Sequence, residues 1–380
     1  MVPAPTPSAM EGTERLDVIR LARTEGIGPV NFRRLMREHG SAASALAALP
    51  ARLQRAGRRG RIAIPDRDAI EREQDALHRM GGRLLVLGDP DYPALLARVP
   101  DAPPVLGVKG DVSLLSRRSI GIVGARNASA GGLRIAESLS GSLALEGCVI
   151  VSGLARGIDS VAHRAALHPG MTIGAAAGGL DCFYPPENEA LYHAVAERGC
   201  LITEAPLGTV PQSSHFPRRN RLIAGLSLGV ILIEAALRSG TLITARLALD
   251  YGRDVFAVPG SPLDPRSRGG NDLIRQGAIL TETVQDVLAQ IGSENRHPAF
   301  AGQTRLPGLA EPPALVFAPE IPPGEIIAHI RELLSPTPMP VDDIVARCQF
   351  SVSLVLSALS ELELGGVATF LPGGQVVRAA

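Results

Sequence analysis

Apolar residues follow two different spacings along the chain, and the spacing changes near residue 83. Between Glu14 and about Gly82 they recur at helical intervals, which predicts helices near residues 14–24, 30–39, 41–49 and 66–80. From Arg83 onward, short apolar runs alternate with helical stretches. Alternation of helices with continuously apolar strands is typical of a parallel sheet that is covered by helices on both faces. We therefore expect a helical region followed by an α/β region.

The α/β region can be divided into individual elements. The expected strands are Ser119–Val123, Val149–Val151, Met171–Ala176, Leu201–Thr203, Val230–Ile233 and Asp254–Val258. The expected helices lie near residues 130–146, 155–168, 187–198, 241–251 and 270–276. Ligands of such sheets bind outside the carboxyl ends of the strands. The residues that follow each strand are therefore the candidates for a functional site.

The two ends of the chain have patterns of their own. Near the start, Gly26-Ile27-Gly28-Pro29 joins two predicted helices as in a helix-hairpin-helix unit, whose backbone amides can bind a phosphate or serve structure alone. Residues 293–323 are rich in proline and read as an extended linker. Helices near residues 325–334, 341–347 and 351–364 precede a hairpin of Val367–Leu371 and Gln375–Arg378, a pattern typical of a winged helix.

Four segments follow from these patterns. They are a helical domain over residues 11–82, an α/β domain over 83–292, a linker over 293–323 and a winged-helix-like domain over 324–380. The last predicted helix, Ser351–Leu364, contains no Lys or Arg and carries Glu361 and Glu363. Because reading of the DNA major groove depends on basic side chains, we expect this domain to dock protein or to regulate the rest of the chain.

Composition narrows the class of protein. The 380 residues are 45% hydrophobic, with 38 basic and 38 acidic side chains, so a nucleic-acid site would have to be a local patch. The cysteines Cys148, Cys182, Cys200 and Cys348 are scattered, which favours buried thiols over a zinc site or disulfides. No apolar run could span a bilayer and the start lacks a signal peptide, so we expect a cytoplasmic protein that makes no membrane contact.

The most unusual stretch is His215-Phe216-Pro217-Arg218-Arg219-Asn220-Arg221. No acidic residue occurs between Glu204 and Glu234, so we expect these arginines to remain without a neutralising partner nearby. A second acid-free window, Val112–Ala136, carries Arg117, Arg118, Arg126 and Arg134. A fold that joins the two windows would create a cationic groove. Phe216 would then offer a ring for stacking, although Pro217 could instead shape a turn that tucks this ring into the core.

Several strand ends carry glycine with hydroxyl or arginine side chains. Gly124 and Arg126 follow the first strand, and Ser129 is a plausible cap for the next helix, where an anion would sit well. The spacing is not that of a dinucleotide fingerprint. After the second strand, Ser152, Asp159 and His163 have the residue types of a catalytic triad, but without a nucleophile elbow a structural Asp159–His163 pair is the better interpretation.

These strings together resemble one family. Gly-Ala-Arg-Asn-Ala-Ser, Ser-Gly-Leu-Ala-Arg-Gly-Ile-Asp, Gly-Gly-Leu-Asp-Cys-Phe-Tyr-Pro, Phe-Pro-Arg-Arg-Asn-Arg-Leu-Ile-Ala-Gly-Leu-Ser, Glu-Ala-Ala-Leu-Arg-Ser-Gly-Thr-Leu-Ile-Thr-Ala and Phe-Ala-Val-Pro-Gly-Ser are similar to motifs of the DNA-processing protein A (DprA or Smf) family, in order, over residues 83–291. The resemblance implies an extended Rossmann-like domain that binds single-stranded DNA, forms a homodimer and helps to load the RecA recombinase during natural transformation. It implies no catalytic residue, and we expect neither a cofactor nor a metal.

The resemblance places the DNA pocket on Gly124, Arg126, Ser152, Gly153, Gly179, Phe216, Arg219 and Asn220. With the neighbouring strand-end residues, the candidate DNA-binding set is Gly124, Ala125, Arg126, Ser129, Ser152, Gly153, Arg156, Gly179, Phe216, Arg218, Arg219, Asn220, Arg221, Ser239, Gly240 and Thr241. The alternative is a nucleotide-cleaving enzyme, since related Rossmann-like folds include phosphoribohydrolases. Glu234 is the carboxylate that could serve such an enzyme.

Overall fold

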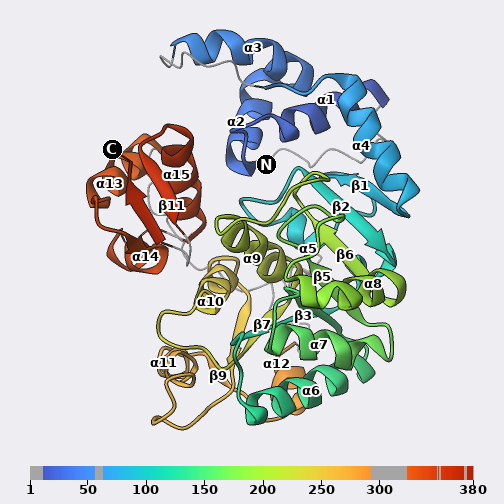
Figure 1. Cartoon of the computed structure of the whole chain (residues 1–380), viewed down its shortest axis with the longest axis vertical. Coiled ribbons are helices and arrows are strands. Elements are labelled where there is room, and N and C mark those ends of the chain that lie inside the picture. The colour runs from blue at the N-terminus through green and yellow to red at the C-terminus, as the bar shows by residue number, and fades with distance from the viewer. Residues whose placement is uncertain are drawn as a thin grey trace, which may run out of the picture.

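The structure is a computed structural model of the chain, shown in Figure 1. It describes residues 12–55, 63–291, 323–348, 350, 352–371 and 375–379. The linker predicted over residues 293–323 lies outside the described residues except for Pro323, which begins a helix. Among the described residues, every helix is too short or too polar to span a bilayer.

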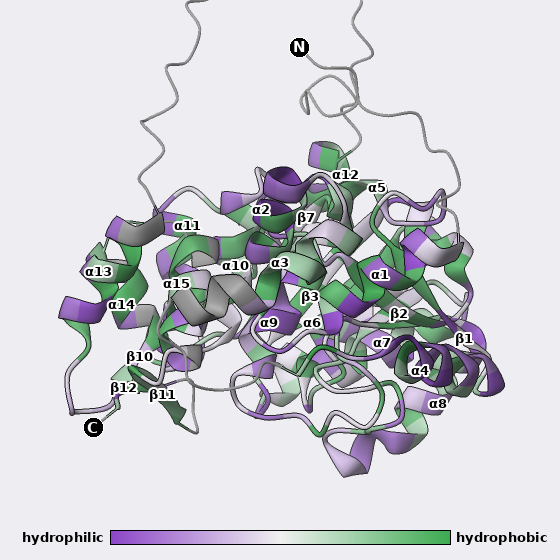
Figure 2. Cartoon of the chain, turned by 90° about the horizontal axis from the view of Figure 1, so that it is seen from above, coloured by the Kyte–Doolittle hydropathy of each residue, from purple (hydrophilic) through white to green (hydrophobic). Residues whose placement is uncertain are grey.

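The N-terminal region is a cluster of helices, as the apolar spacing predicts. The helices are α1 (Gly12–Arg23), α2 (Pro29–His39), α3 (Ala42–Arg55) and α4 (Arg67–Arg79). Pro29 begins α2 at a position where its missing amide proton costs nothing. Ion pairing of Arg15 with Asp89 at 2.6 Å ties the cluster to the sheet. Figure 2 shows that α4 is largely hydrophilic, as expected for a helix with a broad solvent-facing surface.

The central region is built on a nine-stranded sheet in the order β1-β2-β6-β5-β4-β3-β7-β8-β9. The strands are β1 (Gly82–Val86), β2 (Val105–Gly110), β3 (Ser119–Gly124), β4 (Val149–Ser152), β5 (Thr172–Ala175), β6 (Cys200–Thr203), β7 (Gly229–Ile233), β8 (Asp254–Ala257) and β9 (Ile279–Leu280). Neighbours from β6 to β9 pair in parallel, while β2 runs antiparallel to both β1 and β6. The sheet is therefore a parallel Rossmann-like sheet extended at one edge.

Helices cover both faces of this sheet (Figure 1). One layer contains α6 (Ala130–Leu145), α7 (Ile158–Leu167) and α8 (Glu189–Arg198), and the other contains α9 (His215–Leu226) and α10 (Thr241–Asp250). Shorter helices are α5 (Ala94–Ala97), α11 (Arg268–Arg275) and α12 (Val284–Ile291). The chain moves from β3 outward to β6 and then returns through α9 to β7 on the other side of β3. This return creates the point where the strand order reverses.

Helix α9 is the main difference from the sequence expectation. Its first turns are the His215–Arg221 run, which was not predicted as a helix and in which the alternative interpretation placed a turn at Pro217. Pro217 is instead the third residue of the helix and is buried. A proline is tolerated in the first turn because the amide protons there have no partner within the helix. The run is therefore a helix with a defined direction for each side chain.

The C-terminal region is a winged helix with its own core. It contains α13 (Pro323–Leu333), β10 (Met339–Pro340), α14 (Val341–Cys348), α15 (Val352–Leu364), β11 (Ala368–Leu371) and β12 (Gln375–Arg378). Its sheet has the order β10-β12-β11, and the expected hairpin pairs antiparallel. The predicted turn at residues 372–374 lies outside the described residues. In Figure 1 this unit, drawn in red, lies beside α10.

The predicted Asp159–His163 pair is wrong. His163 Nδ1 lies 2.7 Å from Thr172 Oγ1, and Thr172 Oγ1 donates to the carbonyl of Ile150. Since the hydroxyl proton is used in that bond, His163 Nδ1 is the donor, and the ring links α7 to β5. Burial raises the pKa of Asp159, and the positive charge of Arg219 opposes that shift. Among the cysteines, Cys182 is only half-buried, whereas Cys148, Cys200 and Cys348 are buried, and all four are free thiols.

Complete burial lowers the pKa of His163 to about 3. The unfolded chain therefore binds a proton to this residue near pH 6.5, while the folded protein does not. We expect the free energy of unfolding to fall as the pH drops below about 6.5, with a contribution from His163 of at most about 1.4 kcal/mol per pH unit. Urea denaturation between pH 7 and pH 4 measures it.

The variant His163→Gln should show a shallower pH dependence than the wild type. His168→Gln is the matched control, because His168 follows α7 and is exposed. Equal pH slopes for the wild type and His163→Gln would contradict this role for His163.

Candidate nucleic-acid interface

The candidate residues gather at the carboxyl ends of the parallel strands. The strand order reverses between β3 and β7; Gly124 is the last residue of β3, and Glu234 follows β7. A crevice at such a reversal is the usual ligand position in open α/β sheets. We call this end of the sheet, where the parallel strands finish, the rim.

An arginine and two aromatic rings meet at the rim. Phe216, in the first turn of α9, is half-buried, and the guanidinium carbon of Arg126 lies 5.2 Å from its ring centroid. The ring of Tyr184 lies 5.4 Å from that of Phe216 with an interplanar angle of 54°. Tyr184 is 42% exposed. Phe216 is thus not sealed in the core, and together the three side chains form a surface that we call the ring cluster.

Tyr184 was not among the predicted site residues. It follows the β5 strand end in Gly178-Gly179-Leu180-Asp181-Cys182-Phe183-Tyr184, and only 3% of the chain is aromatic. Two adjacent aromatic residues after a glycine-rich strand end were therefore a usable signal. The sequence could not show which of the two faces outward. Phe183 packs against Tyr192, at 5.4 Å between ring centroids, whereas Tyr184 turns to Phe216.

The loop that carries Arg126 is held by the start of α7. Ile158 N donates to the carbonyl of Ala125 at 3.3 Å. Gly157 has a φ of +73°, and a Cβ there would lie 2.3 Å from the Ala125 carbonyl oxygen. Only glycine permits this close approach. The motif after β4 therefore fixes the loop after β3, while the Arg126 side chain remains exposed.

Arg219 lies beneath the rim and is 5% exposed. It donates to the carbonyls of Gly153 and Ala175, the latter at 2.9 Å, and thereby joins the ends of β4 and β5. Burial lowers the pKa of Arg219 and the nearby Asp159 charge opposes that shift. Gly153 leaves room for the guanidinium, since a Cβ there would lie 2.3 Å from Arg219 Nη1. Arg219 supports the loops of the rim from inside.

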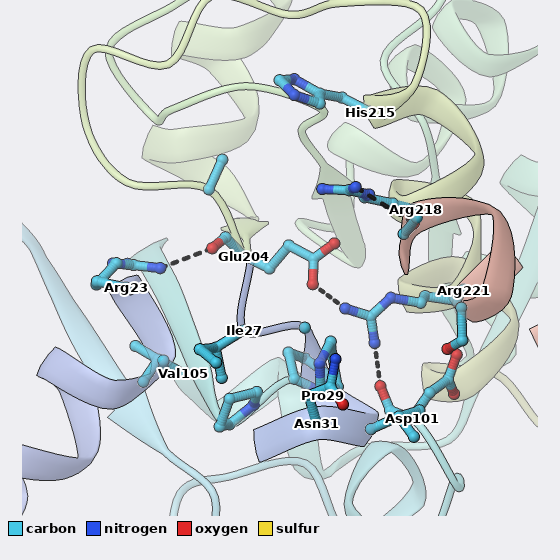
Figure 3. A pocket seen from close by; sticks show the side chains of 18 of the residues that line it. Arg23, Ile27, Pro29, Asn31, Asp101, Val105, Glu204, His215, Arg218 and Arg221 are labelled. Carbon is cyan, nitrogen blue, oxygen red and sulfur yellow. Dashed lines mark hydrogen bonds and ion pairs between the residues drawn. The ribbon is translucent and has the colours of Figure 1, made fainter. Parts of the chain in front are cut away.

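Arg221 points away from the rim and is also buried. Its guanidinium forms an ion pair with Glu204 and donates to the carbonyl of Asp101 (Figure 3). The expectation that the arginines of the run lack an acidic partner is therefore wrong for Arg221. The fold brings Glu204, at the end of β6, against the following helix.

The second acid-free window does not join the first as a whole. Arg117 and Arg118 precede β3, so they lie at the amino-terminal end of that strand, opposite to the rim. Arg134 is exposed on α6, one turn beyond its start. Arg126 is the arginine of this window that meets Phe216. The positive charge at the rim is thus smaller than the sequence predicted.

The expected anion position at the start of α6 is filled by the protein itself. Ser129 caps the helix, accepting from Gly132 N at 3.0 Å. The carboxylate of Glu234 accepts hydrogen bonds from Ser129 N, at 2.8 Å, and from Ser129 Oγ. Glu234 reaches this position from a φ of +56°, which is uncommon outside glycine. A carboxylate at a helix N-terminus is favourable, so an external anion is not needed there.

Three other predicted residues serve structure or pair locally. Ser152 is fully buried and donates to the carbonyl of Ile122 at 2.6 Å, which links β4 to β3. Gly179 is buried and donates through its amide to the carbonyl of Thr209 at 3.0 Å. Arg156 is exposed and forms an ion pair with Glu187, close in sequence to Tyr184.

The remaining predicted residues line the rim beside Phe216. Asn220 donates to the carbonyl of Gly240 at 3.4 Å, which joins α9 to the start of α10. Ser239 accepts from Thr241 N at 3.2 Å, and Thr241 Oγ1 donates to the carbonyl of Gly124 at 3.2 Å. The loops after β3 and β7 are therefore in direct contact. Asn220 and Thr241 are half-buried and Gly240 is exposed.

Arg218 faces another part of the molecule. Its Nη2 lies 3.3 Å from Ser360 Oγ on α15 of the winged helix. It also lines a cavity of about 310 Å³ between the α1–α2 hairpin, the sheet and α15 (Figure 3). Arg126 and Phe216 do not line this cavity. One face of helix α9 therefore points toward the rim, and another lines the cavity.

Three family models match most of the chain. The family model for DNA recombination-mediator protein A matches residues 83–292. The model of the DprA-like N-terminal HHH domain matches residues 12–76, and that of the DprA winged helix domain matches residues 313–374. The α/β region and both flanking modules therefore correspond to one known domain order.

Individual relatives agree with this assignment. DNA processing protein DprA of Bacillus subtilis (strain 168) is 44% identical over 222 residues, covering 58% of this chain and 75% of the relative. The X-ray structure of DprA from Streptococcus pneumoniae is 42% identical with a TM-score of 0.56, covering 60% of this chain and 78% of that one. A structure of DNA processing protein A from Helicobacter pylori, which describes its single-stranded DNA binding mode, is 29% identical with a TM-score of 0.50, covering 56% and 96%. The chain belongs to the DprA/Smf family of DNA recombination-mediator proteins.

Proposed function

We propose that this protein binds single-stranded DNA at the rim without cleaving it and passes the strand to a RecA-type recombinase. The observation that carries the proposal is the ring cluster, with Arg126 5.2 Å from the Phe216 centroid and Tyr184 5.4 Å from the same ring. Sites for single strands combine ring faces, on which bases stack, with cations that contact the backbone. The ring cluster supplies both kinds of group.

The shape of the rim supports a single strand as the ligand. The ring of Tyr184 is exposed and that of Phe216 half-buried, so bases can reach them only when they are free of a complementary strand. The start of α10 lies at the same rim, where the positive end of the helix dipole favours phosphate. The Helicobacter pylori relative, described as binding single-stranded DNA, agrees with this choice.

Within the proposal, the buried arginines have a supporting part. Arg219 and Arg221 use their donors on Gly153, Ala175, Asp101 and Glu204, so they hold α9 rather than contact phosphate. Arg126 is the principal phosphate ligand, and Asn220, Ser239 and Thr241 add neutral donors beside it. At such a site, the affinity for a single strand comes mainly from stacking on the ring faces, and it depends only modestly on the salt concentration.

Transfer to a recombinase and a homodimer formed through the α/β domain belong to the proposal through the family resemblance. A sedimentation experiment that finds only the 39.8 kDa monomer would remove the dimer. A recombinase filament assay on strands coated with single-strand-binding protein tests the transfer. Filament growth that is unaffected by the protein would remove that part.

Replacing Arg126 with alanine should weaken binding of a single-stranded oligonucleotide and reduce its salt dependence. Loss of one phosphate contact lowers the slope of log K against log salt by about 0.7 for single strands. Arg134→Ala is the matched control, since it removes an exposed arginine from α6. The measurement is a fluorescence titration of single-stranded and duplex oligonucleotides at two salt concentrations. Duplex binding as tight as single-strand binding would contradict the proposal.

Removing either ring should weaken binding with little change in salt dependence. Phe216→Leu keeps apolar bulk and Tyr184→Ala removes the exposed ring, and each should cost about 1–3 kcal/mol, the value of one stacked base. Tyr184→Phe retains the ring and should bind almost as the wild type does. Wild-type affinity in Phe216→Leu and in Tyr184→Ala would show that bases do not stack here.

The enzyme alternative can be tested directly. Because both carboxylate oxygens of Glu234 accept hydrogen bonds from Ser129, we expect Glu234 to serve as a cap for α6 and not as a general base. Incubation with nucleoside monophosphates should release no free base, by chromatographic assay. Turnover that disappears in Glu234→Gln would establish the enzyme instead.

A further inference from the structure

The winged helix contacts α9, the helix that carries Phe216 of the ring cluster. Helix α15 packs beside α10, and its Ser360 Oγ lies 3.3 Å from Arg218 Nη2 of α9. Figure 3 shows the α15 ribbon passing next to Arg218. Arg218 is only half-buried. The contact with α15 therefore covers the Arg218 guanidinium, and Arg218 lies two residues after Phe216 in the same helix.

The covering helix carries the opposite charge. Glu361 and Arg218 line the same cavity, and the charge of Glu363 acts on the Arg218 guanidinium. Both glutamates are half-buried, and α15 contains no lysine or arginine. Acidic side chains of α15 therefore face the side of α9 that carries Arg218, where the phosphates of a nucleic-acid backbone would offer the same charge.

The cavity below α15 is a continuation of the α9 surface. It is lined by the Gly26–Asn31 hairpin, by the ends of β5 and β6, by His215 and Arg218, and by Leu356, Ser357, Ser360 and Glu361 of α15. Its three other arginines are already committed, since Arg23 pairs with Glu73, Arg221 pairs with Glu204, and Arg219 donates to backbone carbonyls at the ends of β4 and β5. Arg218 is then the cation of α9 that a ligand in this described cavity can reach, and His215 adds an imidazole whose pKa is lowered, chiefly by burial. Without α15, this face would open to solvent.

The cavity and the ring cluster are on adjacent faces of one helix turn. His215 and Phe216 are neighbours in sequence, yet His215 lines the cavity and Phe216 meets Tyr184. A strand stacked on Phe216 therefore has its next phosphates within reach of the His215 side of α9. The hydrogen bond from Arg218 to Ser360 and the packing of half-buried Leu356 against the core of the α/β domain keep α15 over this side. Because the hydrogen bond is only partly buried, a competing anion can replace it.

We propose that the face of α9 formed by His215 and Arg218 is a second stretch of the strand-binding site, and that α15 covers it as an acidic lid which single-stranded DNA displaces. The inference rests on the proposed function and extends it to a longer strand. The acidic side chains of α15 and the phosphates of the strand compete for Arg218. Short strands that fill only the ring cluster leave the lid in place.

Displacement of the lid can be followed with a thiol in the cavity lining. Ser357→Cys places a reactive group on α15, where Ser357 lines the cavity. Labelling by a maleimide should become faster when a long oligothymidine is added and remain unchanged with a short one. The parent protein corrects for Cys182, the half-buried native cysteine. Equal labelling rates with and without a saturating long oligonucleotide would overturn the lid.

Neutralising the lid should strengthen binding of the long strand. The double variant Glu361→Gln/Glu363→Gln should raise affinity about two- to fivefold at low salt, the size of a partly exposed ion pair. Glu332→Gln is the control, because Glu332 is exposed on α13 of the same domain. Adding Arg218→Gln should abolish the gain, since the competing partner is then absent. A gain that persists without Arg218, or an equal gain in Glu332→Gln, would overturn the proposal.

The two proposals fail in different ways. If Arg126→Ala weakens wild-type binding while the lid variants and the labelling rates show no change, the ring cluster binds the strand and the lid is wrong. If binding does not depend on Arg126, Phe216 or Tyr184, the proposed site is wrong, and the lid proposal, which rests on that site, is wrong as well.

Discussion

The burial of two arginines from one helix is the interaction on which the site depends. Arg219 and Arg221 anchor α9 by bonds to the ends of β4 and β5, to Glu204 and to the Asp101 carbonyl. Removing a partner from a buried charge is strongly destabilising, by about 3–5 kcal/mol, because the remaining charge has no compensation. Helix α9 is therefore fixed in rotation as well as in position.

That fixed rotation decides what α9 presents on each side. With Arg219 turned inward, Phe216 and Asn220 face the rim, and His215 and Arg218 face the cavity. The N-terminal domain takes part in the same arrangement, since Arg23 of α1 donates to the Glu204 carbonyl at 2.7 Å. Glu204 thus links the N-terminal domain, the sheet and α9. The domains meet around one helix, which allows a change at α15 to reach the rim.

The sequence was sufficient for the parallel strands from Ser119 to Val258, but β1, β2 and β9 were not predicted. Apolar runs and helical spacing are local properties, and each predicted strand between Ser119 and Val258 is present within a residue or two. The sequence could not show which arginines are buried, because their partners are distant along the chain: Asp101 is 120 positions from Arg221. Helix α9 was missed since its polar first turns hide the apolar face that begins at Leu222. The contact between Tyr184 and Phe216 likewise joins different loops.

The carboxylate of Glu234 has a consequence for which molecules can enter the crevice. It already holds the helix start where free nucleotides place their phosphates in many related folds. A small, highly charged metabolite arriving there would meet a fixed negative group and gain few contacts in return. A polymer bound along the rim through ring faces and one arginine avoids that repulsion. For the strand-binding function that we propose, Glu234 thus limits competition from mononucleotides at this crevice.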